Sequence, residues 1–372
     1  MSFQTYLLNR TPFSVEKLIL PSEDGQESVL VVVSSTFVAN IHGTSLRLSD
    51  VQTSIKAADE YNGSPEFGSI RYESDIAQKK LFVDVLINGH AHAPRGRRTD
   101  SVMVKLMIGD VRKELVVSGD RRWLKRSFGL ASSNPKSFDR MPIIYERAFG
   151  GVDRRHEDPK NHAAEARNLS GLGYQGVPSY DPKIESEIPN VEYPHARMTS
   201  MSDKPVPAGF GVIARGWQPR IKFAGTYDDA WLKERWPFLP KDFDPRHYQA
   251  APLDQQSRTL KGGEAVTLLN LTPEGIWQFR LPTLDIPVRL YFDDRQEQIS
   301  LRMDTILIEP DDRRVTMTSR VCVRTVRNKG ALREIVVGHT TKGWLRAKAA
   351  RKTYMDFGGN DGTLTKSSNF KL

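Results

Sequence analysis

Proline and tryptophan are concentrated between residues 206 and 282, and this stretch limits what the chain can fold into more than any other. It holds four of the six tryptophans. Each proline fixes a bend or a strand edge because it locks φ and has no backbone donor. Tryptophans such as Trp217 and Trp231 bury a large area but need a partner for the indole N–H. The stretch therefore predicts turns that aromatic side chains fasten to a core, and an architectural role is favoured over a catalytic one.

Strand patterns lie on both sides of this stretch. Residues 28–38 are rich in β-branched side chains and almost continuously apolar, which is typical of a strand buried on both faces. A preceding strand from Val15 is expected to meet it across a turn at Glu23-Asp24-Gly25. Further alternating or apolar runs predict strands over residues 81–87, 101–108, 112–117, 264–271, 276–281, 288–292, 299–308 and 315–326.

Two helices are predicted. The first begins near Thr226, because Thr226-Tyr227-Asp228-Asp229 resembles a capping box, and it ends before Pro237. The second spans residues 341–357, where lysines and arginines alternate with apolar residues, and Gly358-Gly359 ends it. This basic helix either packs on the β body or docks on a partner. The tail beyond it, residues 360–372, is expected to be mobile.

Together these patterns predict a mainly β protein with two β-sandwich-like subdomains, a few short helices and a C-terminal basic helix. The Pro/Trp-rich segment joins the two subdomains. Residues 1–150 are expected to form the N-terminal β subdomain and residues 151–205 a polar, loop-rich segment. Residues 206–330 contain the Pro/Trp-rich segment and the C-terminal β subdomain, and residues 331–372 the basic helix and a flexible tail.

The charge balance favours a protein partner over a nucleic acid. The net charge is +9, but acidic residues are interspersed with the basic ones along the chain, whereas nucleic-acid binders more often place positive charge on one face. An acidic protein fits this surplus. The N-terminus lacks the features of a secretory signal, and the longest apolar run is too short to span a bilayer. We therefore expect a cytoplasmic protein without membrane insertion.

Patterns that carry chemistry in other proteins are weak in this chain. His90 and His92 share one strand face and could bind a metal, but no third ligand is near in the sequence. Residues 171–176 match G-x-G-x-x-G without the strand and helix that a dinucleotide site needs around it. Cys322 is expected to be a buried, inert thiol, and Asp304 to pair with a buried arginine. No metal and no cofactor are predicted.

A hydrolase is the alternative that the residues leave open. Glu146, Asp228, Asp229 and Asp254 could supply carboxylate pairs for attack on carbohydrate or peptidoglycan. Glu146 is more simply explained by an ion pair with the adjacent Arg147. No G-x-S-x-G, H-E-x-x-H or Walker A motif occurs. Catalysis is therefore not predicted, although groups far apart in sequence could still converge.

A family resemblance covers roughly residues 15–326. The ordered motifs Trp217-Gln218-Pro219-Arg220, Ala224-Gly225-Thr226-Tyr227-Asp228 and Pro252-Leu253-Asp254-Gln255-Gln256 resemble an uncharacterised bacterial family. Its genes sit beside PAAR-repeat spike-tip proteins and toxic effectors in type VI secretion loci. The chain departs from the family at Leu81, where proline usually follows the lysine. The positions to which the resemblance assigns an architectural role are Gly150, Gly151, Trp217, Pro219, Arg220, Gly225, Asp228, Trp231, Asp242, Asp254, Gln255 and Gln256.

The resemblance implies an effector adaptor or chaperone. Such a protein would bind a toxic effector in the cytoplasm and help to load it onto the PAAR spike-tip complex. Interfaces of this kind depend on a few aromatic or arginine anchors. The candidate protein-binding residues are Arg95, Arg97 and Arg98 in one basic loop, and Trp344 and Arg346 in the basic helix, while Trp123 and Trp217 would qualify if they are exposed.

Overall fold

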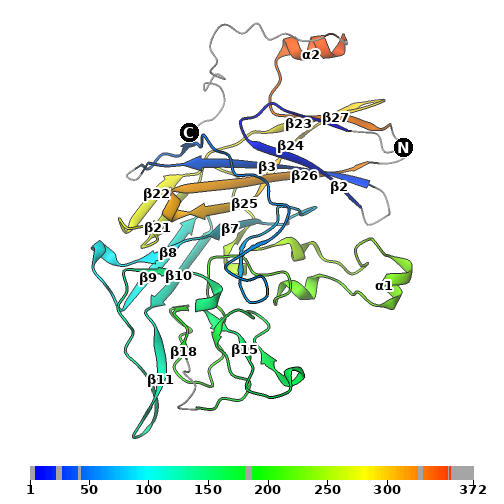
Figure 1. Ribbon diagram of the computed structural model, residues 1–372. Coiled ribbons are helices and arrows are strands. Elements are labelled where there is room, and N and C mark those ends of the chain that lie inside the picture. Colours follow the sequence, from blue (N-terminus) through cyan, green and yellow to red (C-terminus); the bar gives the residue numbers. More distant parts are fainter. Residues whose placement is uncertain are drawn as a thin grey trace.

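The computed structural model describes residues 5–21, 27–40, 43–180, 187–325, 330–350 and 352. Within them the chain is mainly β, as predicted, and its two α-helices are α1 (Asp229–Glu234) and α2 (Lys342–Ala349). Figure 1 shows three large sheets stacked in the upper and middle part of the molecule, with loop-rich segments below and to the right. No helix in the described part of the chain is long and apolar enough to cross a bilayer.

The largest sheet has seven strands. Their order is β2-β3-β26-β25-β7-β20, with β4 also paired to β3, and β7 runs parallel to β25. The strands are β2 (Ser14–Pro21), β3 (Glu27–Val38), β4 (Arg47–Leu48), β7 (Val83–Ile87), β20 (Gln256–Ser257), β25 (Arg302–Glu309) and β26 (Arg314–Thr325). As predicted, β3 is buried along almost its whole length. A strand buried on both faces requires a layer on each side of its sheet.

Two further sheets supply layers around this one. A five-stranded sheet has the order β19 (Val191–Glu192), β10 (Val111–Ser118), β9 (Ser101–Ile108), β21 (Ala265–Leu269) and β22 (Ile276–Arg280). A four-stranded sheet has the order β1 (Tyr6–Asn9), β27 (Leu332–Val337), β23 (Pro287–Phe292) and β24 (Gln296–Ser300). The run predicted as one strand over residues 299–308 is divided at Leu301, where the chain passes from β24 of the four-stranded sheet to β25 of the seven-stranded one.

Short strands and 3₁₀ helices form the remaining connections. The short strands are β5 (Glu60–Tyr61), β6 (Ile70–Tyr72), β8 (His90–His92), β11 (Arg121–Arg126), β12 (Gly129–Ser132), β13 (Arg140–Pro142), β14 (Phe149–Gly150), β15 (Val152–Asp153), β16 (Ala163–Ala164), β17 (Leu172–Gly173) and β18 (Glu187–Ile188). The 3₁₀ helices are η1 (Pro94–Gly96), η2 (Tyr145–Arg147), η3 (Pro159–Asn161), η4 (Arg220–Phe223), η5 (Pro245–Tyr248), η6 (Leu253–Gln255) and η7 (Pro310–Asp312).

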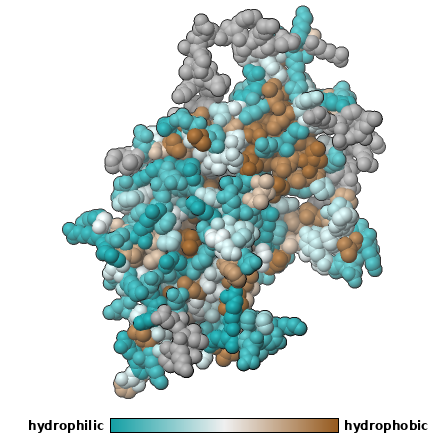
Figure 2. Space-filling view, viewed as in Figure 1, coloured by the Kyte–Doolittle hydropathy of each residue, from teal (hydrophilic) through white to brown (hydrophobic). Residues whose placement is uncertain are grey.

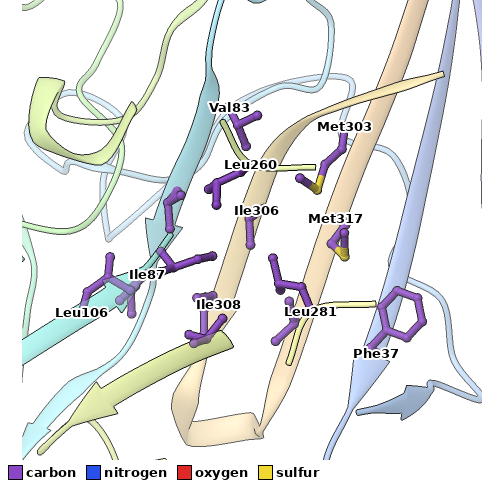
Figure 3. Packing of buried hydrophobic residues seen from close by; sticks show 14 of the residues in the cluster. Phe37, Val83, Ile87, Leu106, Leu260, Leu281, Met303, Ile306, Ile308 and Met317 are labelled. Atoms are coloured by element: carbon purple, nitrogen blue, oxygen red, sulfur yellow. The ribbon is translucent and has the colours of Figure 1, made fainter. Parts of the chain in front are cut away.

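One hydrophobic core joins the three large sheets. It includes Val31 of β3, Leu106 of β9, Ile308 of β25 and Leu290 of β23, all essentially inaccessible to water. Figure 3 shows Leu106 and Ile87 beside Ile306 and Ile308, with Met317 and Phe37 further along the same layer. This burial is the main source of stability for the arrangement.

The two predicted β subdomains are interleaved in the sheets. In the seven-stranded sheet, β3 and β7 from residues 1–150 lie in one ladder with β25 and β26 from residues 206–330. In the five-stranded sheet, β9 pairs with β21 across the same division. The segment 331–372, expected to hold only a helix and a tail, also contributes β27 to the four-stranded sheet. These pairings join residues far apart in sequence, and local patterns do not encode them.

Both helices form, although the start of α1 and the end of α2 differ from those predicted. The N-cap of α1 is Asp228 and not Thr226, because the Asp228 carboxylate accepts the Trp231 N–H at 2.8 Å. Thr226 instead donates its hydroxyl to Asp242 at 2.8 Å. Thr341 caps α2, which ends at Ala349. The turn predicted at Glu23-Asp24-Gly25, the helix end at Gly358-Gly359 and the tail lie outside the described residues.

Candidate functional site

The motif residues Asp254 and Gln255 hold a buried lysine of β10. The Lys113 ammonium donates to Asp254 Oδ1 at 2.9 Å and to Gln255 Oε1 at 2.7 Å. Gln255 Nε2 donates in turn to the carbonyls of Val85 and Phe210, at 2.6 and 3.0 Å. Burial lowers the pKa of Lys113 to about 8, although the nearby Asp254 carboxylate opposes this shift. The arrangement ties the Pro/Trp-rich segment to β10 of the five-stranded sheet and to β7 of the seven-stranded sheet. The neighbouring Gln256 amide closes the turn by donating to Ala251 O at 2.8 Å.

The Gly150-Gly151 turn is fixed by Asn168. The Asn168 amide donates to Tyr145 O at 2.8 Å and to Phe149 O at 3.0 Å. Gly150 has φ 152°, and a Cβ there would lie 2.3 Å from Asn168 O, so only glycine fits. Gly151 extends the same turn by donating its N–H to Asn168 O at 2.8 Å.

The predicted ion pair between Glu146 and Arg147 is not formed. Glu146 accepts hydrogen bonds from the Ser69 N–H at 2.6 Å and the Ser69 hydroxyl at 2.8 Å. Arg147 points elsewhere and donates to Asp120 at 3.0 Å and to Asn190 at 3.1 Å. Adjacent side chains in the η2 turn diverge, so that each one reaches a different loop.

Trp217 and Arg220 anchor the start of the Pro/Trp-rich segment. Trp217 is 5% exposed and meets the Tyr145 ring edge-on, with ring centroids 5.5 Å apart. Pro219 caps η4, which carries the buried Arg220. Arg220 donates to Glu73 Oε1 at 2.6 Å, to Ile213 O at 2.6 Å and to His247 O at 2.9 Å. Trp217 is therefore not available as an exposed anchor, and the same holds for Trp123, which is also buried.

Residues 219–244 form a projecting segment, which we call the arm. Figure 1 shows it at the right, with α1 at its outer end and away from the sheets. Gly225, at φ 83°, allows the chain to turn beside Asp242. The Trp231 indole donates to Phe238 O at 2.9 Å, and its ring lies 4.7 Å from that of Tyr227. These contacts give the arm a defined shape with few sheet contacts.

The outer end of the arm exposes large side chains. Tyr227 is 54% exposed, Leu232 58% and Trp236 64%. Leu232 lies on α1, and Trp236 follows the C-cap residue Arg235, just beyond the end of this helix. Trp236 was not among the binding residues predicted from the sequence. Large exposed aromatic and aliphatic side chains that lie together mark interaction sites.

The predicted protein-binding residues fall into two separate groups. Arg95, Arg97 and Arg98 are all exposed in and after η1, and Arg98 donates to Ser137 O at 2.6 Å. Trp344 and Arg346 lie on α2, which Figure 1 shows above the four-stranded sheet. Trp344 is half-buried against Arg10 and Tyr291, while Arg346 is exposed. The structure does not bring the basic loop and α2 together.

The four carboxylates of the hydrolase alternative are held in separate places. Glu146 is bound by Ser69, and Asp254 accepts from Lys113 and from the Tyr193 hydroxyl at 2.9 Å. Asp228 caps α1, and Asp229 is exposed in its first turn. No two of the four share a hydrogen-bonding partner among the contacts of the described residues.

The His90 and His92 pair brackets a carboxylate. His90 Nδ1 lies 2.8 Å and His92 Nε2 2.9 Å from the two oxygens of Asp311, and Arg140 lies 3.1 Å from the same carboxylate. Burial would raise the pKa of Asp311, but the hydrogen bonds from both imidazoles more than offset this and lower it. Within the described residues, no group of three or more His, Cys, Asp and Glu side chains is arranged to hold a metal ion.

Cys322 is half-buried and not fully buried as expected, and burial raises the pKa of its thiol. A thiol with a raised pKa is a poor nucleophile at neutral pH. Asp304 does lie beside a buried arginine, as predicted, since its Oδ2 is 3.1 Å from Arg320 Nε.

Buried charges beside β7 were not assigned any role from the sequence. Lys80 donates to Asp84 Oδ2 at 2.7 Å, and both side chains are almost inaccessible to water. Asp84 also accepts from Gln249 Nε2 and from the Ala250 N–H, each at 2.8 Å. Lysine followed four residues later by aspartate is common in sequences, so this spacing carries little signal without the fold.

A protein-family model described as an uncharacterized protein conserved in bacteria (DUF2169) matches residues 24–320. No curated protein and no solved structure gives a match. The matched range contains the basic loop, the arm and the contact of Lys113 with Asp254, whereas α2 follows it. The features that are candidates for a function shared across the family are therefore the loop and the arm.

Proposed function

The chain belongs to the DUF2169 family of uncharacterised bacterial proteins, and we propose that it is a cytoplasmic adaptor or chaperone for a type VI secretion effector. In this role it binds the effector and assists its loading onto the PAAR spike-tip complex. The resemblance of its Trp-Gln-Pro-Arg and Leu-Asp-Gln-Gln motifs to a family encoded in such loci supports the proposal.

The exposed end of the arm is the observation that carries a protein-binding function. Tyr227, Leu232 and Trp236 are large, exposed and close in sequence, whereas most other large side chains of the Pro/Trp-rich segment are covered. The hydrogen bonds of Asp228 and Trp231 hold the backbone at the outer end of the arm in place before any partner binds. A preorganised aromatic surface loses little conformational entropy on binding, so more of its contact energy appears as affinity.

A second surface supports protein binding by another route. Tyr6 and Leu8 of β1 and Ile19 of β2 are exposed. Within the described residues, β1 and β2 are edge strands, each paired on one side only. Figure 2 shows hydrophobic residues gathered in the upper part of the displayed face, over the region of β2 and the four-stranded sheet. Edge strands with exposed apolar side chains can accept a strand from a partner.

Secretion assays in the bacterium test the loading function. Deletion of the gene should strongly reduce secretion of the effector encoded beside it, and should leave a second effector of the same apparatus unaffected. Wild-type protein supplied in trans should restore secretion, and a Leu232→Ser/Trp236→Ser variant should not. Phe128→Ser, which also removes an exposed aromatic ring, is the matched control and should restore it. Unchanged secretion of the neighbouring effector in the deletion strain would rule out this role.

A further inference from the structure

A pocket of about 210 Å³ lies against the seven-stranded sheet. Its floor includes Thr316, Thr318 and Arg320, which occupy alternate positions on β26 and therefore share one face of the sheet. Thr318 is directly opposite Ser34 of β3 and Thr305 of β25, and both of these also line the pocket. Three adjacent strands thus present hydroxyl groups and one guanidinium to the same cavity.

Arg320 differs from the other buried arginines of the described chain. Arg121 and Arg220 donate to carboxylates and backbone carbonyls, and Arg313 donates to Glu274. Among the described residues, the Arg320 side chain has no hydrogen-bond partner, and its Nε and Nη1 atoms are buried. Asp304 lies 3.1 Å from Nε outside hydrogen-bond geometry, and Asp75 lies 3.9 Å from Nη2. Leaving charged donors buried and unsatisfied costs free energy, so an acceptor is expected at this position.

A second unsatisfied group lies on the same face. The Thr316 hydroxyl, two strand positions from Thr318, is also buried without a hydrogen-bond partner. The Lys80 ammonium at the pocket wall donates to Asp84 and to Thr305 at 3.1 Å, which leaves one of its three N–H groups for another acceptor. Residues that carry donors without acceptors therefore line the pocket, on β26 and at Lys80.

The charges around the pocket also favour an anion. The side chains that line it include five cations, Lys56, Arg71, Lys80, Arg314 and Arg320, and three carboxylates, Glu73, Asp75 and Glu309. Several of these charges already have partners. Arg314 holds Glu309 through two hydrogen bonds of 2.6 and 2.9 Å, Lys80 is paired with Asp84, Lys56 with Glu60, and Glu73 with Arg220. Burial raises the pKa of Asp75, and of Asp304 behind the pocket, although the Arg320 charge opposes both shifts.

We propose that this pocket binds a small oxyanion of the phosphate or carboxylate class, with Arg320 as the principal donor and the Thr316 hydroxyl as a second. Water alone could accept hydrogen bonds from these groups but carries no charge, whereas the guanidinium meets its neighbours Asp304 and Asp75 only outside hydrogen-bond geometry. An oxyanion supplies several acceptor oxygens and the opposite charge together. The volume is below that of pockets for drug-sized ligands, which fits an ion of this size.

Calorimetric titration of the full chain tests the proposal. The probes are inorganic phosphate, sulfate and malonate, each added at constant ionic strength, with chloride as the blank. The proposal predicts saturable binding of at least one probe with one site per chain. A preference for phosphate and sulfate over malonate would identify a tetrahedral oxyanion, and the reverse preference would identify a carboxylate.

Two variants locate the site. Arg320→Gln should weaken binding about tenfold or more, because it removes the charged donor. Thr316→Val should weaken it about two- to tenfold without lowering the melting temperature, because the hydroxyl it removes has no partner in the free protein. Thr267→Val on β21, away from the pocket, is the matched control and should bind as wild type does.

Two outcomes would overturn the proposal. The first is the absence of saturable heat with all three probes, which would mean that water fills the pocket. The second is that wild type, Thr316→Val and a folded Arg320→Gln variant all bind the anion with the same affinity. If Arg320→Gln does not fold, Thr316→Val decides, since it tests the same cavity without removing a charge.

Discussion

At the scale of single residues, buried polar side chains fix the position of loops on the sheets. Three buried charged side chains are hydrogen-bonded to segments far away in sequence. Lys113 and Arg220 donate to such segments, and Asp84 accepts from one. A buried charge left without its partner destabilises a protein strongly, so these groups define one arrangement of the loops and disfavour others. Asp254 and Gln255 show why a motif without catalytic character is present, because both side chains accept hydrogen bonds from the buried Lys113.

The Lys113→Met variant should differ from wild type in a pH-dependent way. The pKa of Lys113 is lowered to about 8 in the folded protein, while the unfolded chain keeps the ordinary value near 10.5. Between these values the unfolded state binds more protons, so the free energy of unfolding of wild type rises with pH relative to that of the variant. We expect the difference to grow by roughly 1–3 kcal/mol from pH 7 to pH 10.

Urea denaturation of both proteins across this pH range measures the effect, because titrations that the two proteins share cancel in the difference. A difference that stays constant or shrinks with rising pH would contradict the assigned environment of Lys113.

Truncation of Trp217 should reveal its structural role. Trp217→Ala removes a ring that is 5% exposed and packs on Tyr145, so the free energy of unfolding should fall by ~3–5 kcal/mol. Trp236→Ala is the matched control, and its effect should stay within ~0.5 kcal/mol because that ring is 64% exposed. Equal losses of stability from the two substitutions would show that the assignment of one ring to the core and the other to the surface is incorrect.

At the scale of elements, local patterns predicted the long strands and missed the short ones. The run over residues 101–108 coincides with β9, and residues 28–38 differ from β3 by one residue. Alternation and β-branching are properties of neighbouring residues, so the sequence contains them directly. Two-residue strands such as β14 and β17 exist only because Gly150 pairs with Gly173 in a parallel register that loop packing imposes.

The same limit applies to the candidate site. Sequence spacing predicted the α1 helix and placed Asp228 in its first turn, but it could not tell a buried tryptophan from an exposed one. Trp217 is covered because Tyr145, distant in sequence, packs on it, and Trp236 is exposed because the arm leaves the sheets. The pairing of Asp304 with an arginine was predicted, but the unsatisfied donors of Arg320 became visible only with the fold.

The basic loop makes a prediction at the element scale. Reversal of Arg95, Arg97 and Arg98 to glutamate should weaken binding of an acidic partner about tenfold or more and make binding less salt-dependent. Isothermal calorimetry with the purified partner measures this change. The control is an equal charge reversal at an exposed site on β11, at Arg122, Lys125 and Arg126. Unchanged affinity in the loop variant, or the same loss in the control, would remove the loop from the interface.

At the scale of the whole molecule, the interleaved sheets give the exposed surfaces a fixed relation to one another. Strands from residues 1–150 and 206–330 share the seven-stranded and the five-stranded sheets and one core. Arg220 fastens the base of the arm to Glu73, so the arm leaves this core from a fixed point. A partner would meet a preformed surface, which is consistent with an adaptor that must present its cargo in one orientation.

The most direct test of this account is the amount of neighbour-encoded protein that co-purifies with the tagged chain. Wild type, Leu232→Ser/Trp236→Ser and the control Phe128→Ser are each co-expressed with the products of the neighbouring genes, and the eluted proteins are quantified by mass spectrometry. We expect an effector or PAAR protein at stoichiometric amount with wild type and with Phe128→Ser, and at least about tenfold less with the arm variant. Recovery of the wild-type chain alone with every neighbour would contradict the adaptor function, and equal recovery with all three proteins would exclude the arm.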